Sequence, residues 1–79
     1  MPQASEELRS KMMKRFGSMD TPGPEDFLKQ AGYKLNAGWA WVPKPGVTQY
    51  RDMSRAEFDC LLFLIHEWDY RGFEHEPTA

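Results

Sequence analysis

The apolar residues at the start of the chain recur with the spacing of a helix. Leu8, Met12 and Phe16 are four residues apart, so they would form one stripe along a helical surface. Acidic residues open the segment, basic residues close it, and Gly17 follows, as the helix dipole and a left-handed terminal residue favour. The pattern predicts a helix over residues 6–16. Because the stripe is narrow, we expect this helix to pack loosely or to dock with help from a partner.

The clearest helix signals lie in the last third of the chain. Ser54 and Glu57 have the spacing of a capping box, in which two side chains satisfy the first backbone N–H groups of a helix. Gly72 suits the left-handed position that ends one. We therefore predict a helix over residues 55–70. Its main apolar arc, expected to be the spine of the core, consists of Phe58, Leu61, Leu62, Leu64, Ile65 and Trp68.

A short second helix is predicted after a loop-like stretch. Residues 17–24 are dense in Gly, Pro, Ser and Asp, which is typical of a loop. Pro24 suits the first position of a helix, where its missing N–H would have no partner, and Gly32 suits the end. The second helix would then run over residues 24–31.

From residue 33 onward, strand-like residues replace the helical spacing. Residues 33–35 and 39–42 would form two strands, and the turn between them ends in Gly38, which suits a left-handed bulge. Trp39 and Trp41 would share one face of the second strand. Either this face packs on the long helix as core, or it faces solvent as a platform for binding or base stacking.

Together these elements predict an α+β fold with two N-terminal helices, a short antiparallel hairpin and one long C-terminal core helix. Residues 47–50 leave room for a third short strand. With 79 residues the chain has room for one core, so we expect a single domain over residues 1–79. Its ends, residues 1–5 and 74–79, are expected to be flexible.

Cysteine usage and hydropathy indicate a cytoplasmic protein. Cys60 is the only cysteine and lies in an apolar run, which is typical of a buried thiol in a reducing compartment. That run, residues 60–65, is far shorter than the roughly 20 residues that span a bilayer, and no basic-then-apolar leader opens the chain. Since a chain this small has no disulfide, we expect a partner or a second copy to help stabilise it.

The charge balance argues against broad nucleic-acid binding, and the aromatic content favours a protein interface. Acidic residues outnumber basic ones by 12 to 10, so the chain has no general attraction for a phosphate backbone. Aromatic residues make up 14% of the chain, which is more than so small a core needs. We therefore expect some of them at an interface.

A second apolar patch is predicted on the long helix, outside its main arc, because Phe63 and Tyr70 are seven residues apart. Either the first helix covers this patch, or the patch is a dimer or partner interface. The residues predicted to bind a partner are the anchors Trp39, Trp41, Phe63 and Tyr70 and the polar rim Arg51, Asp59, Glu67 and Arg71.

The sequence carries no motif for catalysis, a metal or a cofactor. It has no CxxC or HxxxH pattern, which metal sites commonly use. Cys60 and His66 would lie about 120° apart around a helix, so they could not act together as nucleophile and base. We expect neither an enzyme nor a bound cofactor.

Three hypotheses of function follow. In size, with its Trp-bearing hairpin and its capped apolar helix, the chain resembles the small accessory proteins of bacteriophages and mobile elements, which often inhibit or redirect a host complex. This resemblance implies an inhibitor or adaptor that binds another protein. The alternatives are a structural subunit of a larger assembly and a nucleic-acid accessory protein, whose possible phosphate contacts are Arg9, Lys11, Lys14 and Arg15.

Overall fold

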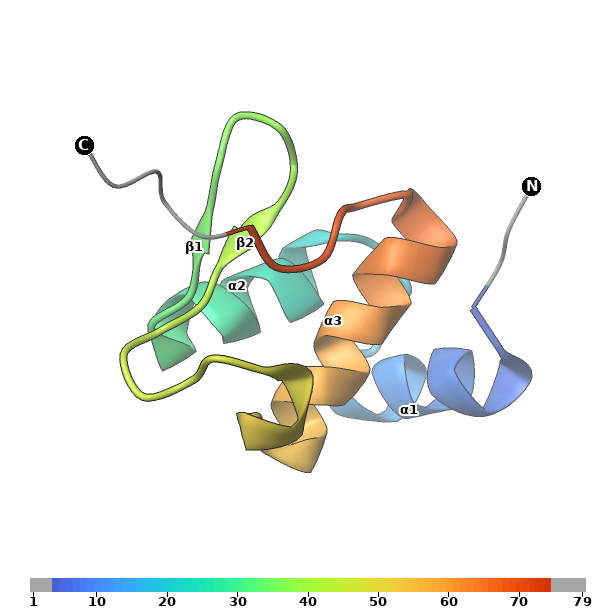
Figure 1. Ribbon diagram of the computed structural model, residues 1–79. Helices are drawn as coiled ribbons and strands as arrows, with labels where there is room; N and C mark the ends of the chain where they lie inside the picture. Colours follow the sequence, from blue (N-terminus) through green and yellow to red (C-terminus); the bar gives the residue numbers. More distant parts are fainter. Residues whose placement is uncertain (1–3, 75–79) are drawn as a thin grey trace.

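Helix α3 (Arg55–Trp68) lies in the middle of the molecule, and the other elements are arranged around it (Figure 1). The computed structural model describes residues 4–74. The α+β class and the predicted order of two helices, a hairpin and a long last helix are confirmed. The other elements are α1 (Glu6–Phe16), α2 (Pro22–Ala31), the antiparallel strands β1 (Lys34–Leu35) and β2 (Trp41–Val42), and the 3-10 helix η1 (Tyr50–Asp52).

Helix α1 begins and ends where the sequence predicts. The Ser5 hydroxyl accepts a hydrogen bond from the Leu8 N–H at 3.2 Å, and Gly17 ends the helix with a φ of 70°. Leu8 and Met12 are buried, Met12 completely. Leu8 and Met12 of the stripe therefore pack on the core of the single chain.

The described parts of the two chain ends are bonded to the rest of the molecule. Ala4 is buried, and its N–H donates to Glu67 Oε1 at 3.3 Å. At the other end, the Glu74 N–H donates to the Trp41 carbonyl at 2.8 Å. The rest of the ends that the sequence predicts to be flexible, residues 1–3 and 75–79, lies outside the described residues.

Helix α2 begins two residues earlier than predicted, at Pro22. Pro22 and Pro24 both fit in the first turn, because a helix leaves its first N–H groups without intrahelical partners. A glycine is needed between them, since a Cβ at Gly23 would lie 2.7 Å from Cγ of Phe16. The stretch that resembles a loop in the sequence thus packs the start of α2 against the end of α1.

The predicted hairpin is confirmed, but its turn differs from the prediction. The residue in the left-handed region is Trp39, with a φ of 62°, and not Gly38. Asn36 organises the loop, because its Oδ1 accepts from the N–H groups of Gly38 and Ala40 at 2.9 and 3.1 Å. These two bonds fix a five-residue loop from 36 to 40, longer than the predicted three-residue turn.

This longer loop separates the two tryptophans that were predicted to share a face. Leu35 pairs with Trp41, so the paired part of the second strand begins only after Trp39. Trp41 is fully buried, whereas Trp39 is 56% exposed. The prediction of one shared tryptophan face is therefore wrong.

Residues 47–50 do not form the predicted third strand. The Asp52 carboxylate accepts hydrogen bonds from the N–H groups of Thr48 and Gln49, each at 3.1 Å, and the chain turns into η1. Because the carboxylate takes up these N–H groups, they are not available for a strand ladder.

The extended segment beside β2 comes instead from the chain after α3. The Arg71 N–H donates to the Trp39 carbonyl at 2.8 Å, and the Trp41 N–H donates to the Gly72 carbonyl at 3.0 Å, in parallel alignment. Gly72 is needed there, because a Cβ would collide with the Tyr50 hydroxyl. This pairing ties the hairpin to the end of α3.

Helix α3 has the predicted start and an earlier end. The Ser54 hydroxyl accepts from the Glu57 N–H at 3.2 Å, and the Glu57 carboxylate accepts from the Ser54 N–H at 3.1 Å, so the capping box is confirmed. The helix ends at Trp68, because Asp69 adopts the left-handed conformation, with a φ of 66°, that we predicted for Gly72. Within residues 4–74 no helix is long and apolar enough to cross a membrane.

The core is one cluster to which all three helices and the hairpin contribute. On α3 the buried face is rotated from the predicted arc, because Phe63 and Cys60 are fully buried, whereas Trp68 is 44% exposed. The largest fully buried side chains are Trp41, Phe63, Met12, Leu28, Leu61 and Leu64.

The buried carboxylate of Glu57, in the first turn of α3, bonds to the chain just before and just after the hairpin. Glu57 is 7% exposed, and it accepts hydrogen bonds from the Tyr33 hydroxyl at 3.0 Å and from Lys44 Nζ at 2.8 Å. Burial alone would raise the pKa of Glu57, but the hydrogen bonds from Lys44, Ser54 and Tyr33 outweigh it and hold that pKa below its ordinary value. The carboxylate therefore stays ionised in the fold.

Candidate protein-binding surface

Two of the four predicted anchors lie in the core. Trp41 and Phe63 have no exposed surface. Asp59 and Glu67, four residues before and after Phe63 on α3, form ion pairs with α1, so α1 lies on the side of α3 that carries Phe63. Neither side chain can reach a partner in this fold. Both are core residues, which was the alternative interpretation of each.

Trp39 is the most exposed large apolar side chain among the residues of the hairpin, with 56% of its surface accessible. Its backbone is in the left-handed region, which is costly for a bulky residue. The Asn36 side chain and the Arg71 N–H bond the backbone around it, and so hold it there. The fold thus presents an indole to solvent in a fixed position.

Tyr70 packs against Trp39. The two rings are 5.3 Å apart between centroids and tilted by 57°. The Tyr70 hydroxyl donates to Glu25 Oε1 of α2 at 2.6 Å, and this bond holds the pKa of Glu25 below its usual value. Burial and the same carboxylate raise the pKa of Tyr70 to about 12. Tyr70 is therefore neutral, and its hydroxyl is held by a hydrogen bond within the molecule.

Trp68 is a second exposed tryptophan, although the sequence places it on the core arc. The residue is 44% exposed, and its indole N–H donates to the Met19 carbonyl at 2.9 Å. Tyr70, two residues on, bonds to Glu25, so both side chains rest on the segment of residues 19–25. We call Trp39, Tyr70 and Trp68 the aromatic surface. Sequence reasoning missed Trp68, because the helical spacing places it in line with the buried Leu61 and Leu64.

The predicted polar rim does not gather around this surface, apart from Arg71. Arg71 is exposed and its backbone is bonded to Trp39. Glu67 pairs with Arg9 at 3.4 Å, and Asp59 pairs with Lys11 at 3.5 Å. These two ion pairs join α1 to α3, so the carboxylates have a role within the fold.

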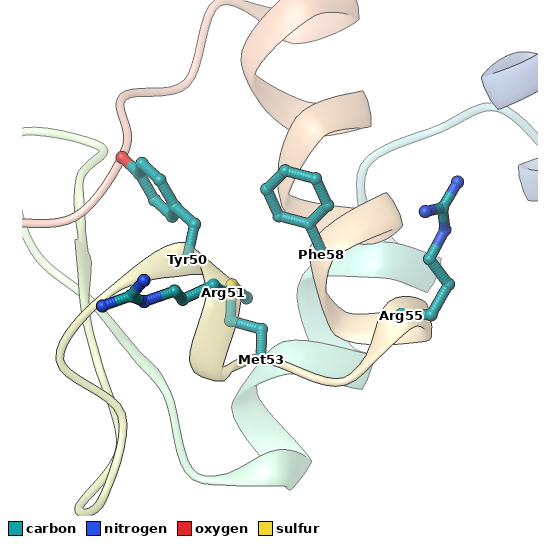
Figure 2. A pocket seen from close by; sticks show the side chains of 5 residues that line it. All are labelled: Tyr50, Arg51, Met53, Arg55 and Phe58. Atoms are coloured by element: carbon teal, nitrogen blue, oxygen red, sulfur yellow. The ribbon is translucent and has the colours of Figure 1, made fainter.

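Arg51, the last residue of the predicted rim, lines a separate open groove beside η1. The groove has a volume of about 490 Å³, and Figure 2 shows the rings of Tyr50 and Phe58 in it, with arginines on either side. Sequence reasoning missed the groove, because it assigned Tyr50 to a strand and Phe58 to the core arc. We call it the η1 groove; its lining is Tyr50, Arg51, Met53, Arg55 and Phe58.

The basic residues of α1 are only partly available for phosphate contacts. Arg9 and Lys11 form the ion pairs with α3. The Arg15 guanidinium lies over the ring of Phe27, 5.4 Å from its centroid. Lys14 is exposed. The four side chains thus do not present one continuous stripe of charge that is directed to solvent.

The residues that could carry chemistry are dispersed. Cys60 is fully buried, and burial raises the pKa of its thiol to about 12. His66 is exposed. Over residues 4–74, no three His, Cys, Asp or Glu side chains are grouped so that they could hold a metal ion.

The fold and its surface define the protein as a small α+β domain that presents aromatic side chains to solvent. The chain belongs to a phage family: the model of the family described as Phage Pam3 gp59 related protein matches residues 1–79. Neither the comparison with curated proteins nor the comparison with solved structures gives a match. Membership of a phage family agrees with the resemblance to small phage accessory proteins.

Proposed function

We propose that this phage protein is a non-catalytic binding module, an inhibitor or adaptor that attaches to the surface of another protein through Trp39. The observation that carries the proposal is that Trp39 is both exposed and held in the left-handed region. A bulky residue in that region costs about 1–2 kcal/mol. Glycine would avoid this cost, so stability does not account for a tryptophan there.

The neighbours of Trp39 support a role as an anchor. Trp and Tyr are over-represented among the residues that dominate binding energy, because they bury a large area at a low entropy cost. Tyr70 lies against the ring, and Trp68 is a second exposed indole on the segment that also holds Tyr70. Arg71 is exposed, and its backbone N–H donates to the Trp39 carbonyl. Such a surface suits a shallow apolar depression on a partner protein.

The test is capture from a bacterial host lysate with tagged protein, washed at low and at high salt. We expect a stoichiometric protein complex that survives the high-salt wash, since apolar contacts are not screened by ions. Trp39→Ala should abolish capture while the melting temperature stays close to that of the wild type. Met13→Ala, which removes an exposed apolar side chain of α1, is the matched control and should capture normally.

Each other outcome points to a different function. If Trp39→Ala captures as well as Met13→Ala does, the aromatic surface is not the binding site. Nucleic acid that is lost in the high-salt wash would favour the nucleic-acid accessory protein. A homodimer that captures nothing, seen by light scattering, would assign the surface to self-association.

A further inference from the structure

The η1 groove has an apolar floor that is built before any ligand arrives. Tyr50 is 43% exposed, and its ring lies 4.6 Å from that of Phe73 and 6.2 Å from that of Phe58. Its hydroxyl accepts the Phe73 N–H at 3.1 Å, so the ring cannot swing away freely. Met53 adds a polarizable thioether to the lining.

Two guanidinium groups stand on either side of this floor. Figure 2 shows Arg51 on the side of Tyr50 and Arg55 beyond Phe58. They come from different elements, η1 and the first turn of α3, so the helical backbone fixes where each arginine side chain begins. The arrangement is an apolar centre with a positive charge at each end.

The charge of this rim is incompletely neutralised within the protein. Arg51 forms no ion pair with any residue between 4 and 74. Arg55 pairs with Asp59 at 3.4 Å, but Asp59 also pairs with Lys11, and the Arg55 side chain remains 76% exposed. Asp52, the other nearby carboxylate, is turned towards the N–H groups of Thr48 and Gln49.

We propose that the η1 groove binds a short acidic segment of a protein partner, with an apolar side chain of the segment on the floor. Its carboxylates would pair with Arg51 and Arg55, which offer the bidentate geometry that carboxylates accept. Charge complementarity determines this choice, because the groove is a positive site on a chain with a formal charge of −2. The site shares no residue with the aromatic surface and does not depend on the function proposed for it.

The shape of the floor favours a peptide over a nucleic acid. Base stacking requires a ring face that is free on the side of the ligand. One face of Tyr50 is occupied by Phe73, and the rings of Tyr50 and Phe58 are inclined by 45°. An aliphatic side chain can fill a gap between two inclined rings, whereas a flat base cannot stack on both.

The experiment measures binding of a fluorescent acidic hexapeptide, composed of aspartates and two leucines, by anisotropy. We expect the wild type to bind it, and the double variant Arg51→Glu, Arg55→Glu to bind at least tenfold more weakly. Both side chains are exposed, and a glutamate in the first turn suits the dipole of α3, so the variant should fold. A basic peptide with the same leucines should show the reverse preference and bind the double variant more tightly.

Two control variants distinguish binding in this groove from a general effect of net charge and from binding at the aromatic surface. Lys14→Glu with Lys34→Glu makes the same change in net charge at exposed lysines outside the groove, and should bind the acidic peptide as the wild type does. Trp39→Ala should also bind it normally, so failure at one surface is distinguishable from failure at the other. Equal binding by the two charge-reversed variants would overturn the proposal. The proposal would also be overturned if the wild type bound an oligothymidine and not the peptide, and the double variant Arg51→Glu, Arg55→Glu lost that binding. Dimerisation of the protein through the groove would overturn it as well.

Discussion

At the scale of single residues, the two tryptophans of the hairpin differ in burial, so substitutions at them can test folding and binding separately. Trp41 fills the core, whereas Trp39 occupies a left-handed backbone position with most of its ring in solvent. We predict that Trp39→Gly changes the free energy of unfolding by no more than about 1 kcal/mol, because relief of backbone strain offsets the lost contact with Tyr70. Trp41→Ala should cost about 3–5 kcal/mol.

Urea denaturation of the two variants and the wild type measures this difference. Because the substitutions are two residues apart in one loop and strand, they share nearly the same local chain, and the two positions differ in burial and in backbone strain. A large loss of stability in Trp39→Gly would mean that the exposed indole serves the fold, and the argument that it serves a partner would lose its basis.

The buried thiol of Cys60 gives a second test at this scale. Burial raises its pKa to about 12, so almost no thiolate exists near neutral pH, and the fully buried sulfur is also shielded from reagents. We predict that a thiol-specific chromogenic reagent reacts slowly with the native protein at pH 8 and at the rate of a free thiol in guanidinium. Fast stoichiometric labelling without denaturant would contradict the buried position.

At the scale of elements, the sequence predicts a helix end correctly where that end is fixed by neighbouring residues, and not where it is fixed by residues far away in the chain. The capping box of Ser54 and Glu57 and the Gly17 terminus involve neighbouring residues, so α1 and the start of α3 could be predicted from spacing. The end of α3 could not, because the segment that follows is fixed by pairing of Arg71 with Trp39, more than thirty residues earlier in the chain. The same pairing replaces the predicted third strand.

The candidate site shows the same limit. Aromatic residues such as the exposed Trp39 and the half-buried Tyr70 could be identified as a surplus over what the core needs. Periodicity alone, however, gives only the direction of a side chain and not what covers it. In the sequence, Phe63 therefore cannot be distinguished from a surface anchor; only the structure shows that α1 lies on its side of α3. The η1 groove combines residues of η1 with residues at the start of α3, and the predicted strand included only Tyr50 of η1, so no pattern along the chain could reveal the groove.

The contact of Glu57 with Tyr33 and Lys44 makes a prediction about the elements that it joins. We expect Glu57→Gln to lower the free energy of unfolding by about 1–3 kcal/mol at neutral pH, since it weakens a partly buried hydrogen-bonded charge pair. Since the pKa of Glu57 is lowered in the fold, its contribution to stability is present above the unfolded pKa of about 4.3 and is lost as pH falls through the folded pKa.

Urea midpoints of the wild type and the variant between neutral and acid pH test both statements. The difference between the two proteins should shrink as pH falls below about 4, where the wild-type carboxylate becomes protonated as well. Some acid sensitivity should remain in the variant, because the pKa of Glu25 is also lowered, by its bond to Tyr70. A difference that is constant with pH would mean that Glu57 acts by packing and not by charge.

At the scale of the whole molecule, all three helices and the hairpin contribute to one core within residues 4–74, so we expect these elements to unfold together. Helix α1 is the most informative element, because it reaches the core through Leu8 and the fully buried Met12 and through two ion pairs. Surface ion pairs contribute little, so the apolar contacts must hold it. Whether the isolated chain is stable therefore depends on the docking of this helix.

We predict that Met12→Ala costs about 2–5 kcal/mol and shifts unfolding of the whole domain, a large fraction of the stability of so small a protein. Far-ultraviolet circular dichroism and tryptophan fluorescence should report the same lowered midpoint, because Met12 and Trp41 lie in one cluster. Met13→Ala, its exposed neighbour, should leave both midpoints unchanged. Loss of helical signal before the fluorescence change would mean that α1 detaches alone. A monomer that unfolds in one step needs no assembly to complete its core, which favours a binding module over a structural subunit.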